Sequence, residues 1–319
     1  MTALEGVVDG AVDGVELQLE AYRRELTGYC YRMLGSLADA EDAVQDAMVR
    51  AWRHASSLRD PAAQRGWLYR IATRVCFDSL DGRRRRALPV DMSPAPSPPV
   101  VSSLGPALES AAWVEPAPDA LVLGTAPAAD PADVAADRES VRLALVAALQ
   151  LLPPRQRAVL VLREVLHWHA DEVAALLETS VPSVNSLLQR ARATLAARDA
   201  REAALQPLDD PHAALLARYT EAFERYDVDA LVALLHAEAT MSMPPYALWL
   251  RGPADVAAWL RGPGRDCEGS RLLPVRLNGQ RALAQYRRTD HGAPTPDPQA
   301  GHTPWALVVM AERDGKVAD

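Results

Sequence analysis

The segment from Asp171 to Leu195 carries polar side chains at a spacing that suits contact with DNA bases. It predicts a first helix over 171–177, a short connection, and a second helix capped by Ser180. On the second helix the apolar residues fall on one face, which leaves a polar face opposite. Asn and Gln can pair with adenine, Arg can pair with guanine, and Ser and Arg can hold phosphate. We therefore predict a DNA-reading helix whose contacts are made by Ser183, Asn185, Ser186, Gln189, Arg190 and Arg192.

An ordinary solvated helix is the alternative for this segment, because its connection carries Glu178 where such motifs usually have glycine. The total charge also argues against a protein that coats nucleic acid, since 34 Lys and Arg against 42 Asp and Glu give a net charge of −8. The distribution of charge differs from the total. Residues 16–86 and 138–201 each hold three more basic than acidic residues, whereas residues 87–137 hold seven acidic and no basic ones. Two mildly basic blocks therefore flank an acidic spacer.

Hydrophobic periodicity indicates the elements that must position these side chains. Residues 16–86 are helical throughout, and helical periodicity returns over 141–204. Between them, residues 87–137 contain ten prolines, a composition that cannot hold a regular element and predicts a linker, although its segment 113–121 is apolar enough to dock on a neighbouring domain. In residues 211–319, two helical stretches precede strand-like runs. The expected fold class is multidomain, with two all-α domains followed by an α+β domain.

Cysteine usage and the N-terminal sequence argue against a disulfide-stabilised, zinc-binding, exported or membrane-spanning protein. The chain has three cysteines, which lie far apart, so neither a disulfide framework nor a zinc site of paired cysteines is predicted. No window approaches 18 uncharged apolar residues, and residues 1–19 lack the basic start of a signal peptide. We expect a cytoplasmic chain with no membrane segment, metal or cofactor. His167 and His169 flank Trp168, but two ligands without a third do not make a metal site, so both are expected to be helix-entry residues.

The residues around the predicted helix-turn-helix resemble a known family. Residues 151–160 (Leu-Leu-Pro-Pro-Arg-Gln-Arg-Ala-Val-Leu) and 184–192 (Val-Asn-Ser-Leu-Leu-Gln-Arg-Ala-Arg) are similar to region 4 of sigma-70-type RNA polymerase sigma factors. The resemblance implies that this part of the chain binds the upstream, −35-type promoter element and the flap of the polymerase β subunit.

The helix predicted over 38–54 carries acids in its first half and places Trp52 on its buried side. Acids at a helix start also suit the helix dipole, which is a purely structural explanation. Residues 37–46 (Leu-Ala-Asp-Ala-Glu-Asp-Ala-Val-Gln-Asp), however, resemble sigma region 2.2, whose acidic and amide face docks on the β′ clamp helices of RNA polymerase. The resemblance implies a polymerase-binding face made by Asp39, Glu41, Asp42, Gln45 and Asp46.

The next helix, predicted from Gly66 to about Leu80, is followed by four consecutive arginines. Residues 65–86 hold seven basic and two acidic side chains, so counterion release would favour DNA binding, although such a run can also be a solvated helix end. Residues 67–78 resemble regions 2.3 and 2.4, which melt and read the −10-type element, and residues 54–65 lie where such factors capture a flipped base. Many such factors have Asn in place of Arg74, so we expect that Arg74 contacts phosphate. The implied downstream contacts are Arg65, Trp67, Arg70, Arg74, Asp78, Arg83 and Arg84.

The C-terminal block, residues 211–317, resembles the SnoaL-like fold, a cone of curved sheet and helices around an apolar pocket. Residues 241–246, 249–252 and 278–280 carry this resemblance. The fold would ordinarily continue with another strand, so we expect that the domain is truncated or that its sheet is completed differently. SnoaL-like enzymes use a buried acid or histidine, but no spacing marks a catalytic pair here. The candidates for such a role are His236, Asp290 and His291.

These features together predict an extracytoplasmic-function sigma factor, which directs core RNA polymerase to specific promoters and is not an enzyme. The expected partners are the β′ clamp helices and β flap of the polymerase, and promoter DNA. The domains are expected at 16–86, 138–204 and 211–319, with a linker at 87–137. The last domain is expected to regulate activity by fixing the spacing of the first two or by binding a small ligand in its cavity. A ligand-responsive DNA-binding regulator that acts without polymerase, and a SnoaL-type isomerase or cyclase, are the alternatives.

Overall fold

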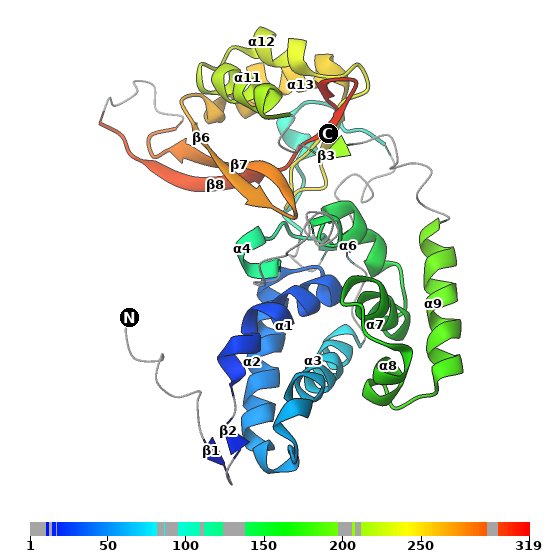
Figure 1. Ribbon diagram of the computed structural model, residues 1–319. Helices are drawn as coiled ribbons and strands as arrows, with labels where there is room; N and C mark the ends of the chain where they lie inside the picture. The colour runs from blue at the N-terminus through cyan, green and yellow to red at the C-terminus, as the bar shows by residue number, and fades with distance from the viewer. Residues whose placement is uncertain are drawn as a thin grey trace. The chain divides into compact units, whose positions relative to one another are not determined.

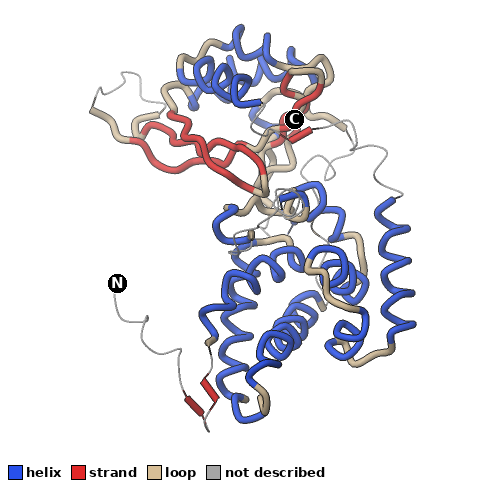
Figure 2. The backbone as a smooth tube through the Cα atoms, viewed as in Figure 1, coloured by secondary structure: helices blue, strands red, loops and turns tan. Residues whose placement is uncertain are grey.

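The chain divides into two compact units, one formed by residues 1–86 with 117–200 and the other by residues 87–116 with 201–319. The first is largely helical, and the second combines helices with antiparallel strands (Figure 1, Figure 2). The chain therefore passes from one unit to the other three times. The computed structural model describes residues 11–12, 15–16, 18–81, 86, 95–108, 112–123, 138–196, 206–207, 212–291 and 299–319.

The first unit begins with a short hairpin and three helices. Gly35 ends the first helix in a left-handed conformation (φ +72°), and the side chain of Ser36 then accepts the backbone N–H of Asp39 to cap the second. The rings of Tyr29 and Tyr69 pack edge to face with centroids 5.1 Å apart in the core. The elements are β1 (Ala11–Val12), β2 (Val15–Glu16), α1 (Leu19–Leu34), α2 (Leu37–Arg53) and α3 (Gln64–Leu80).

Further helices complete the described part of the first unit. Pro154 stands in the first turn of one of them, where its missing N–H removes no helical hydrogen bond. The predicted pair of helices at 171–177 and after Ser180 is present within one residue of the expected bounds. These elements are α4 (Asp119–Val122), α6 (Leu143–Gln150), α7 (Pro154–Leu160), a π-helical turn (Val161–Val165), α8 (Ala170–Leu176) and α9 (Val181–Ala196).

Helix α1 binds one segment within the acidic spacer and one that follows it. A Cβ atom at Gly28 would clash with the carbonyl oxygen of Val122, so glycine allows α4 to approach α1 closely. The buried Arg32 side chain of α1 donates to the Ser140 hydroxyl at 2.7 Å. The expectation that the spacer holds no regular element is therefore wrong at 119–122, because Val122 is buried and anchors a helical turn there.

The second unit is an α+β domain, as the strand-like runs predict. Three antiparallel strands form its largest sheet in the order β6-β7-β8, and α11, α12 and α13 lie along one side of it (Figure 1). The helices are α11 (Ala213–Glu224), α12 (Val228–Leu234) and α13 (Gly252–Arg261). The strands are β3 (Gln206–Pro207), β4 (Thr240–Ser242), β5 (Trp249–Arg251), β6 (Arg271–Leu277), β7 (Gln280–Arg288), β8 (His302–Val308), β9 (Ala311–Arg313) and β10 (Lys316–Val317).

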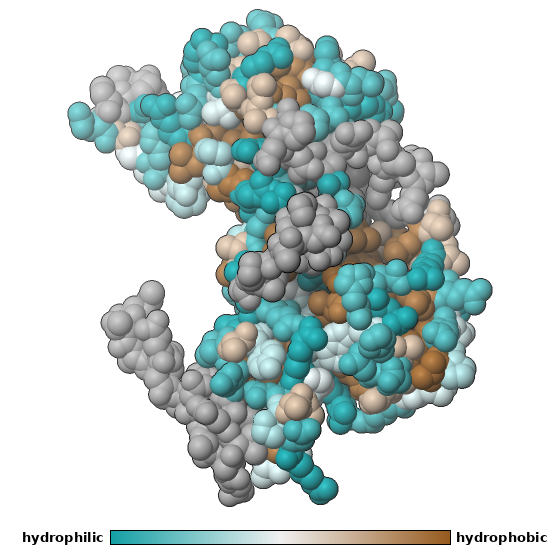
Figure 3. Space-filling model, viewed as in Figure 1, coloured by the Kyte–Doolittle hydropathy of each residue, from teal (hydrophilic) through white to brown (hydrophobic). Residues whose placement is uncertain are grey.

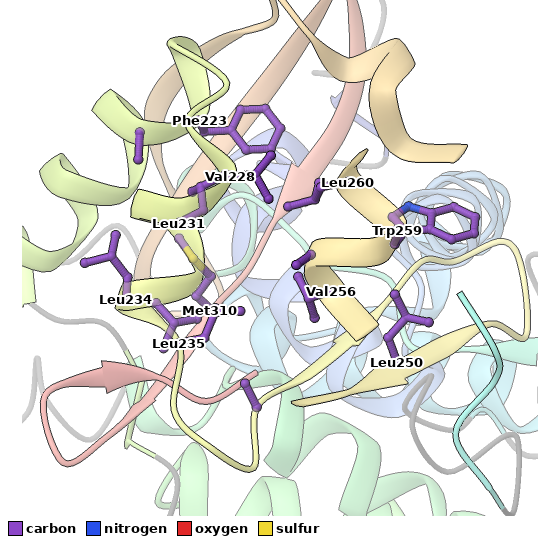
Figure 4. Packing of buried hydrophobic residues seen from close by; sticks show 14 of the residues in the cluster. Phe223, Val228, Leu231, Leu234, Leu235, Leu250, Val256, Trp259, Leu260 and Met310 are labelled. Atoms are coloured by element: carbon purple, nitrogen blue, oxygen red, sulfur yellow. The ribbon is translucent and has the colours of Figure 1, made fainter. Parts of the chain in front are cut away.

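The core of this unit lies among its helices and the C-terminal strands. Phe223 and Leu231 from α11 and α12 face Val256 and Leu260 from α13, with Met310 beside them (Figure 4). Hydrophobic residues also lie over the β6–β8 sheet on the visible surface (Figure 3). The exposed large hydrophobic side chains of this sheet include Leu273, Trp305 and Leu307.

Part of the spacer belongs to this second unit. The backbone N–H of Ser97 donates to the Trp249 carbonyl at 2.8 Å, and that of Leu108 donates to the Pro245 carbonyl at 2.7 Å. Between these two bonds, the Leu104 side chain packs against the buried cluster of the unit. Residues 97–108 therefore complete the fold of a domain that begins about a hundred residues later in the sequence.

We expect Leu104→Asp to lower the free energy of unfolding of the second unit by about 2 kcal/mol, because a carboxylate would then face an apolar cluster. Val101→Asp is the matched control, since Val101 is 64% exposed in the same segment. Hydrogen exchange of the β4 and β5 amides measures the difference. Equal exchange in the two variants would show that Leu104 does not stabilise this unit.

Candidate nucleic-acid and protein interfaces

Helices α8 and α9 form the predicted helix-turn-helix. Helix α8 starts after His169, whose backbone N–H donates to the Glu172 carboxylate at 2.6 Å, so His169 is a helix-entry residue as expected. Helix α9 follows Ser180, whose hydroxyl accepts the Ser183 N–H at 3.3 Å. Glu178 lies between the helices with φ +53°, a left-handed conformation that glycine adopts more easily.

The two faces of α9 are as the periodicity predicts. Val184, Leu188 and Ala191 are buried against the neighbouring helices. Of the predicted DNA contacts, Ser183 is half-buried, whereas the others are exposed. Those exposed residues are Asn185, Ser186, Gln189, Arg190 and Arg192. Arg192 forms an ion pair with Glu164 at 2.5 Å, so its guanidinium is already engaged within the unit.

Helix α3 carries the predicted downstream contacts. Arg65 and Arg74 are exposed on it, and Trp67 and Arg70 are half-buried. Asp78 is also exposed and forms an ion pair with Arg50 of α2 at 3.2 Å. The structure thus brings five of the seven predicted residues onto one helix. The other two, Arg83 and Arg84, lie outside the described residues.

A buried indole from the start of the helix-turn-helix lies on α3. Trp168 is 7% exposed, and its ring centroid is 5.0 Å from that of Tyr69. The Arg65 guanidinium lies over the same indole, 5.3 Å from its centroid. Arg65 and the Tyr69 hydroxyl also donate to the Glu25 carboxylate, at 2.8 and 2.9 Å. The only local signal for this contact was an aromatic residue between two histidines, which does not indicate a partner.

Arg65 and Tyr69 both stay protonated, as their hydrogen bonds to the Glu25 carboxylate require. Burial raises the pKa of Tyr69 well above its ordinary value, and the Glu25 carboxylate raises it further, so the phenol stays neutral. Burial is the largest single effect on Arg65 and lowers its pKa, but the hydrogen bond and charge of Glu25, with a smaller contribution from Tyr69, together outweigh burial, so that the pKa is raised. Arg65 is therefore a permanent cation that is partly neutralised within the unit.

The predicted protein-binding face lies on α2. Glu41, Asp42, Gln45 and Asp46 are exposed along it. Asp39 differs from the others because it is half-buried and pairs with Arg86 at 2.7 Å. Arg86 is the last of the four consecutive arginines and is buried rather than part of a basic edge.

Trp52, expected on the buried side of α2, is 54% exposed, so that prediction is wrong. The small side chains of Ala47 and Ala51 form the buried side at this end of the helix. Trp52 follows Ala51 by one residue, which is a rotation of about 100° around the helix axis, so its side chain lies outside the buried side.

The candidate catalytic residues of the C-terminal domain have separate partners. His236 follows α12, and its Nδ1 accepts the Glu238 N–H at 3.0 Å. Asp290 and His291 follow β7, where Asp290 pairs with Arg288 at 2.8 Å. In the described ranges, no three His, Cys, Asp or Glu side chains are placed to hold a metal ion. The helices of those ranges are also too short or too polar to cross a bilayer.

Comparison with known proteins agrees with this arrangement. Family models for Sigma-70 region 2, Sigma-70 region 4 and a SnoaL-like domain match residues 19–86, 142–195 and 216–319. The chain is 47% identical over 276 residues to the ECF RNA polymerase sigma factor SigG of Mycobacterium tuberculosis, which covers 84% of this chain and 72% of SigG. It is 30% identical over 225 residues to SigJ of the same organism, covering 70% of this chain and 63% of SigJ.

A solved structure matches most of the chain. The crystal structure of the Mycobacterium tuberculosis extracytoplasmic function sigma factor SigJ matches with a TM-score of 0.55 at 26% identity, covering 94% of this chain and 93% of that one. The two sigma regions coincide with the α1–α3 helices and with the helix-turn-helix, and the third match coincides with the α+β unit. The chain belongs to the extracytoplasmic-function (ECF) RNA polymerase sigma factors.

Proposed function

We propose that this sigma factor directs core RNA polymerase to promoters by reading an upstream, −35-type element with α9 and a −10-type element with α3. The observation that carries this proposal is the exposed polar row on α9, in which Asn185, Gln189 and Arg190 stand opposite a buried apolar face. Amide and guanidinium groups in such a row can make paired hydrogen bonds with base edges in the major groove. Arg70 and Arg74 on α3 supply positive charge for the downstream strand.

The two sigma regions are also proposed to contact the polymerase. We assign the acidic face of α2, made by Glu41, Asp42, Gln45 and Asp46, to the β′ clamp helices, and region 4 to the β flap. The exposure of these four side chains supports that assignment. The chain would act in the cytoplasm, where the polymerase is found.

The SnoaL-like domain is proposed to regulate the sigma regions rather than to catalyse a reaction. The separate partners of His236, Asp290 and His291 support a non-catalytic role. Residues 97–108, which lie between the two sigma regions in the sequence, pack into this domain. Part of the chain that connects the two DNA-binding regions is thus packed on this domain. We propose that a small ligand in the apolar interior of the domain changes this packing.

The test of the main proposal is capture of core RNA polymerase by the purified full-length chain, followed by open-complex formation on a promoter library. Polymerase binding with selective melting of a subset of promoters is the expected result. Tight binding to duplex DNA without polymerase, combined with no capture of polymerase, would overturn the proposal and favour a stand-alone regulator.

Single alanine substitutions at Asn185, Gln189 and Arg190 should each relax promoter choice at one or two upstream base pairs. Each lost base contact should reduce discrimination against the wrong base by about 1–3 kcal/mol. Thr194→Ala is the control, because Thr194 lies near the end of the same helix and is bonded to the Arg190 carbonyl. Selection from a library randomised in the upstream element measures the effect. An unchanged upstream consensus in all three variants would contradict the assigned role of α9.

A further inference from the structure

The turn of the helix-turn-helix reaches the helix that is proposed to contact the −10-type element. The Glu178 carboxylate in that turn forms an ion pair with the Arg74 guanidinium on α3. We infer that Glu178 is an internal phosphate mimic, which occupies Arg74 and masks the DNA-binding face of region 2 until region 4 moves away. This inference rests on the proposed function, because it takes Arg74 as a contact to the DNA backbone.

The backbone at Glu178 supports a role for its side chain. With φ at +53°, Glu178 has a left-handed conformation, which a residue with a Cβ atom adopts at a cost and which glycine adopts freely. Glutamate is thus an unfavourable choice for the geometry of the turn alone. Its carboxylate, however, lies on a cation 104 residues earlier in the chain. Contact with Arg74 gives a reason for glutamate at this position.

A second contact holds the same helix-turn-helix against α3. Trp168, just before α8, packs on Tyr69 and lies beneath the Arg65 guanidinium, while Glu178, just after α8, pairs with Arg74. Arg65 and Arg74 are nine residues apart, or about two and a half turns of α3. Region 4 therefore engages two arginines of the proposed DNA-binding stretch of region 2.

The strength of the two contacts differs in a way that suits reversible masking. Trp168 is buried, so its packing on Tyr69 is the stable part of the contact. The Arg74 and Glu178 side chains are 60% and 63% exposed, and an exposed ion pair is weak and screened by salt. A DNA phosphate positioned close to Arg74 can displace the Glu178 carboxylate. Nonspecific single-stranded nucleic acid binds less tightly, because the Arg74 guanidinium is already paired with Glu178.

The test uses the full-length chain and a fluorescent single-stranded oligonucleotide of random sequence. Glu178→Gln keeps the size of the side chain and removes its charge, and Glu178→Gly also relieves the left-handed backbone. We expect both variants to bind the oligonucleotide several-fold more tightly than the unmodified chain at low salt. Freeing one cation for phosphate should also steepen the dependence of log affinity on log salt by about one.

Two further variants make the result specific. Glu221→Gln removes an equally exposed, ion-paired carboxylate from α11 and should leave oligonucleotide affinity unchanged. Arg74→Ala combined with Glu178→Gln should abolish the gain, because the freed cation is then absent. If Glu178→Gln binds no more tightly than the unmodified chain, or if the gain survives without Arg74, the masking role is overturned.

Failure of the inference is distinguishable from failure of the proposed function. Arg74→Ala alone, assayed as open-complex formation with core polymerase, tests the DNA contact independently of Glu178. Reduced opening together with unchanged oligonucleotide binding by Glu178→Gln would retain the DNA contact and reject the mask. Unchanged opening by Arg74→Ala would reject the DNA contact, and with it the phosphate mimicry.

Discussion

Arg157→Ala is expected to lower the free energy of unfolding of the helical unit by about 3 kcal/mol, because it leaves several buried acceptors without their donor. Arg157 is 3% exposed and donates to the Gln150 side-chain oxygen at 2.6 Å. It also donates to the backbone carbonyls of Gln150 and Leu152, each at 3.1 Å, and to that of Met33. One guanidinium thus bonds the start of region 4 to the end of α1 in region 2.

The control is Arg155→Ala, two residues earlier on the same helix. Arg155 is exposed, so its loss should change the free energy of unfolding by no more than about 0.5 kcal/mol. Denaturant unfolding followed by circular dichroism compares the two variants, and hydrogen exchange of α6 and α7 locates the loss. If the two substitutions are equally mild, the buried guanidinium does not hold the two regions together. Arg157→Lys should be intermediate, because an ammonium cannot reproduce the forked set of donors.

The hydrophobic repeat predicts which face of a helix is buried, but it does not predict contacts between distant residues such as those of Arg157. The periodicity of α9 identified both its buried and its exposed face, because those depend on the 3.6-residue repeat alone. The same repeat assigned Trp52 to the buried side, which the structure contradicts. The pairing of Asp39 with Arg86, 47 residues later, depends on tertiary contacts that no local pattern contains.

The spacer shows the limit of composition as a guide. Its prolines and small residues predict a chain that cannot form its own core, and that physical argument holds for an isolated segment. A few apolar side chains are nevertheless enough to dock on surfaces that other elements provide. Leu104 packs on the SnoaL-like domain, and Val122 is buried where α4 meets α1. Glu178 and Trp168 likewise acquire their roles from residues about a hundred positions earlier.

The double substitution Asp42→Arg and Asp46→Arg is expected to weaken binding of core RNA polymerase at least tenfold. Both carboxylates are exposed on α2, and Asp46 has only a long contact of 3.8 Å with Arg50, so neither contributes much to the fold. Reversing two charges on a docking face replaces attraction by repulsion across the interface. Asp39 is left unchanged because its pairing with Arg86 would confuse a loss of binding with a loss of stability.

The matched control reverses Asp229 and Asp266, two acids of the SnoaL-like domain, and should leave polymerase affinity unchanged. Affinity is measured by titration of labelled chain with core polymerase at two salt concentrations. The difference between the α2 variant and the unmodified chain should shrink at high salt, because exposed charges are screened. Unfolding of the α2 variant should shift by no more than about 1 kcal/mol, because each substitution is at an exposed position, where the effect is typically within about 0.5 kcal/mol. Equal polymerase affinity for both double variants would contradict the assignment of this face, since a surface that docks through its acids cannot tolerate their reversal.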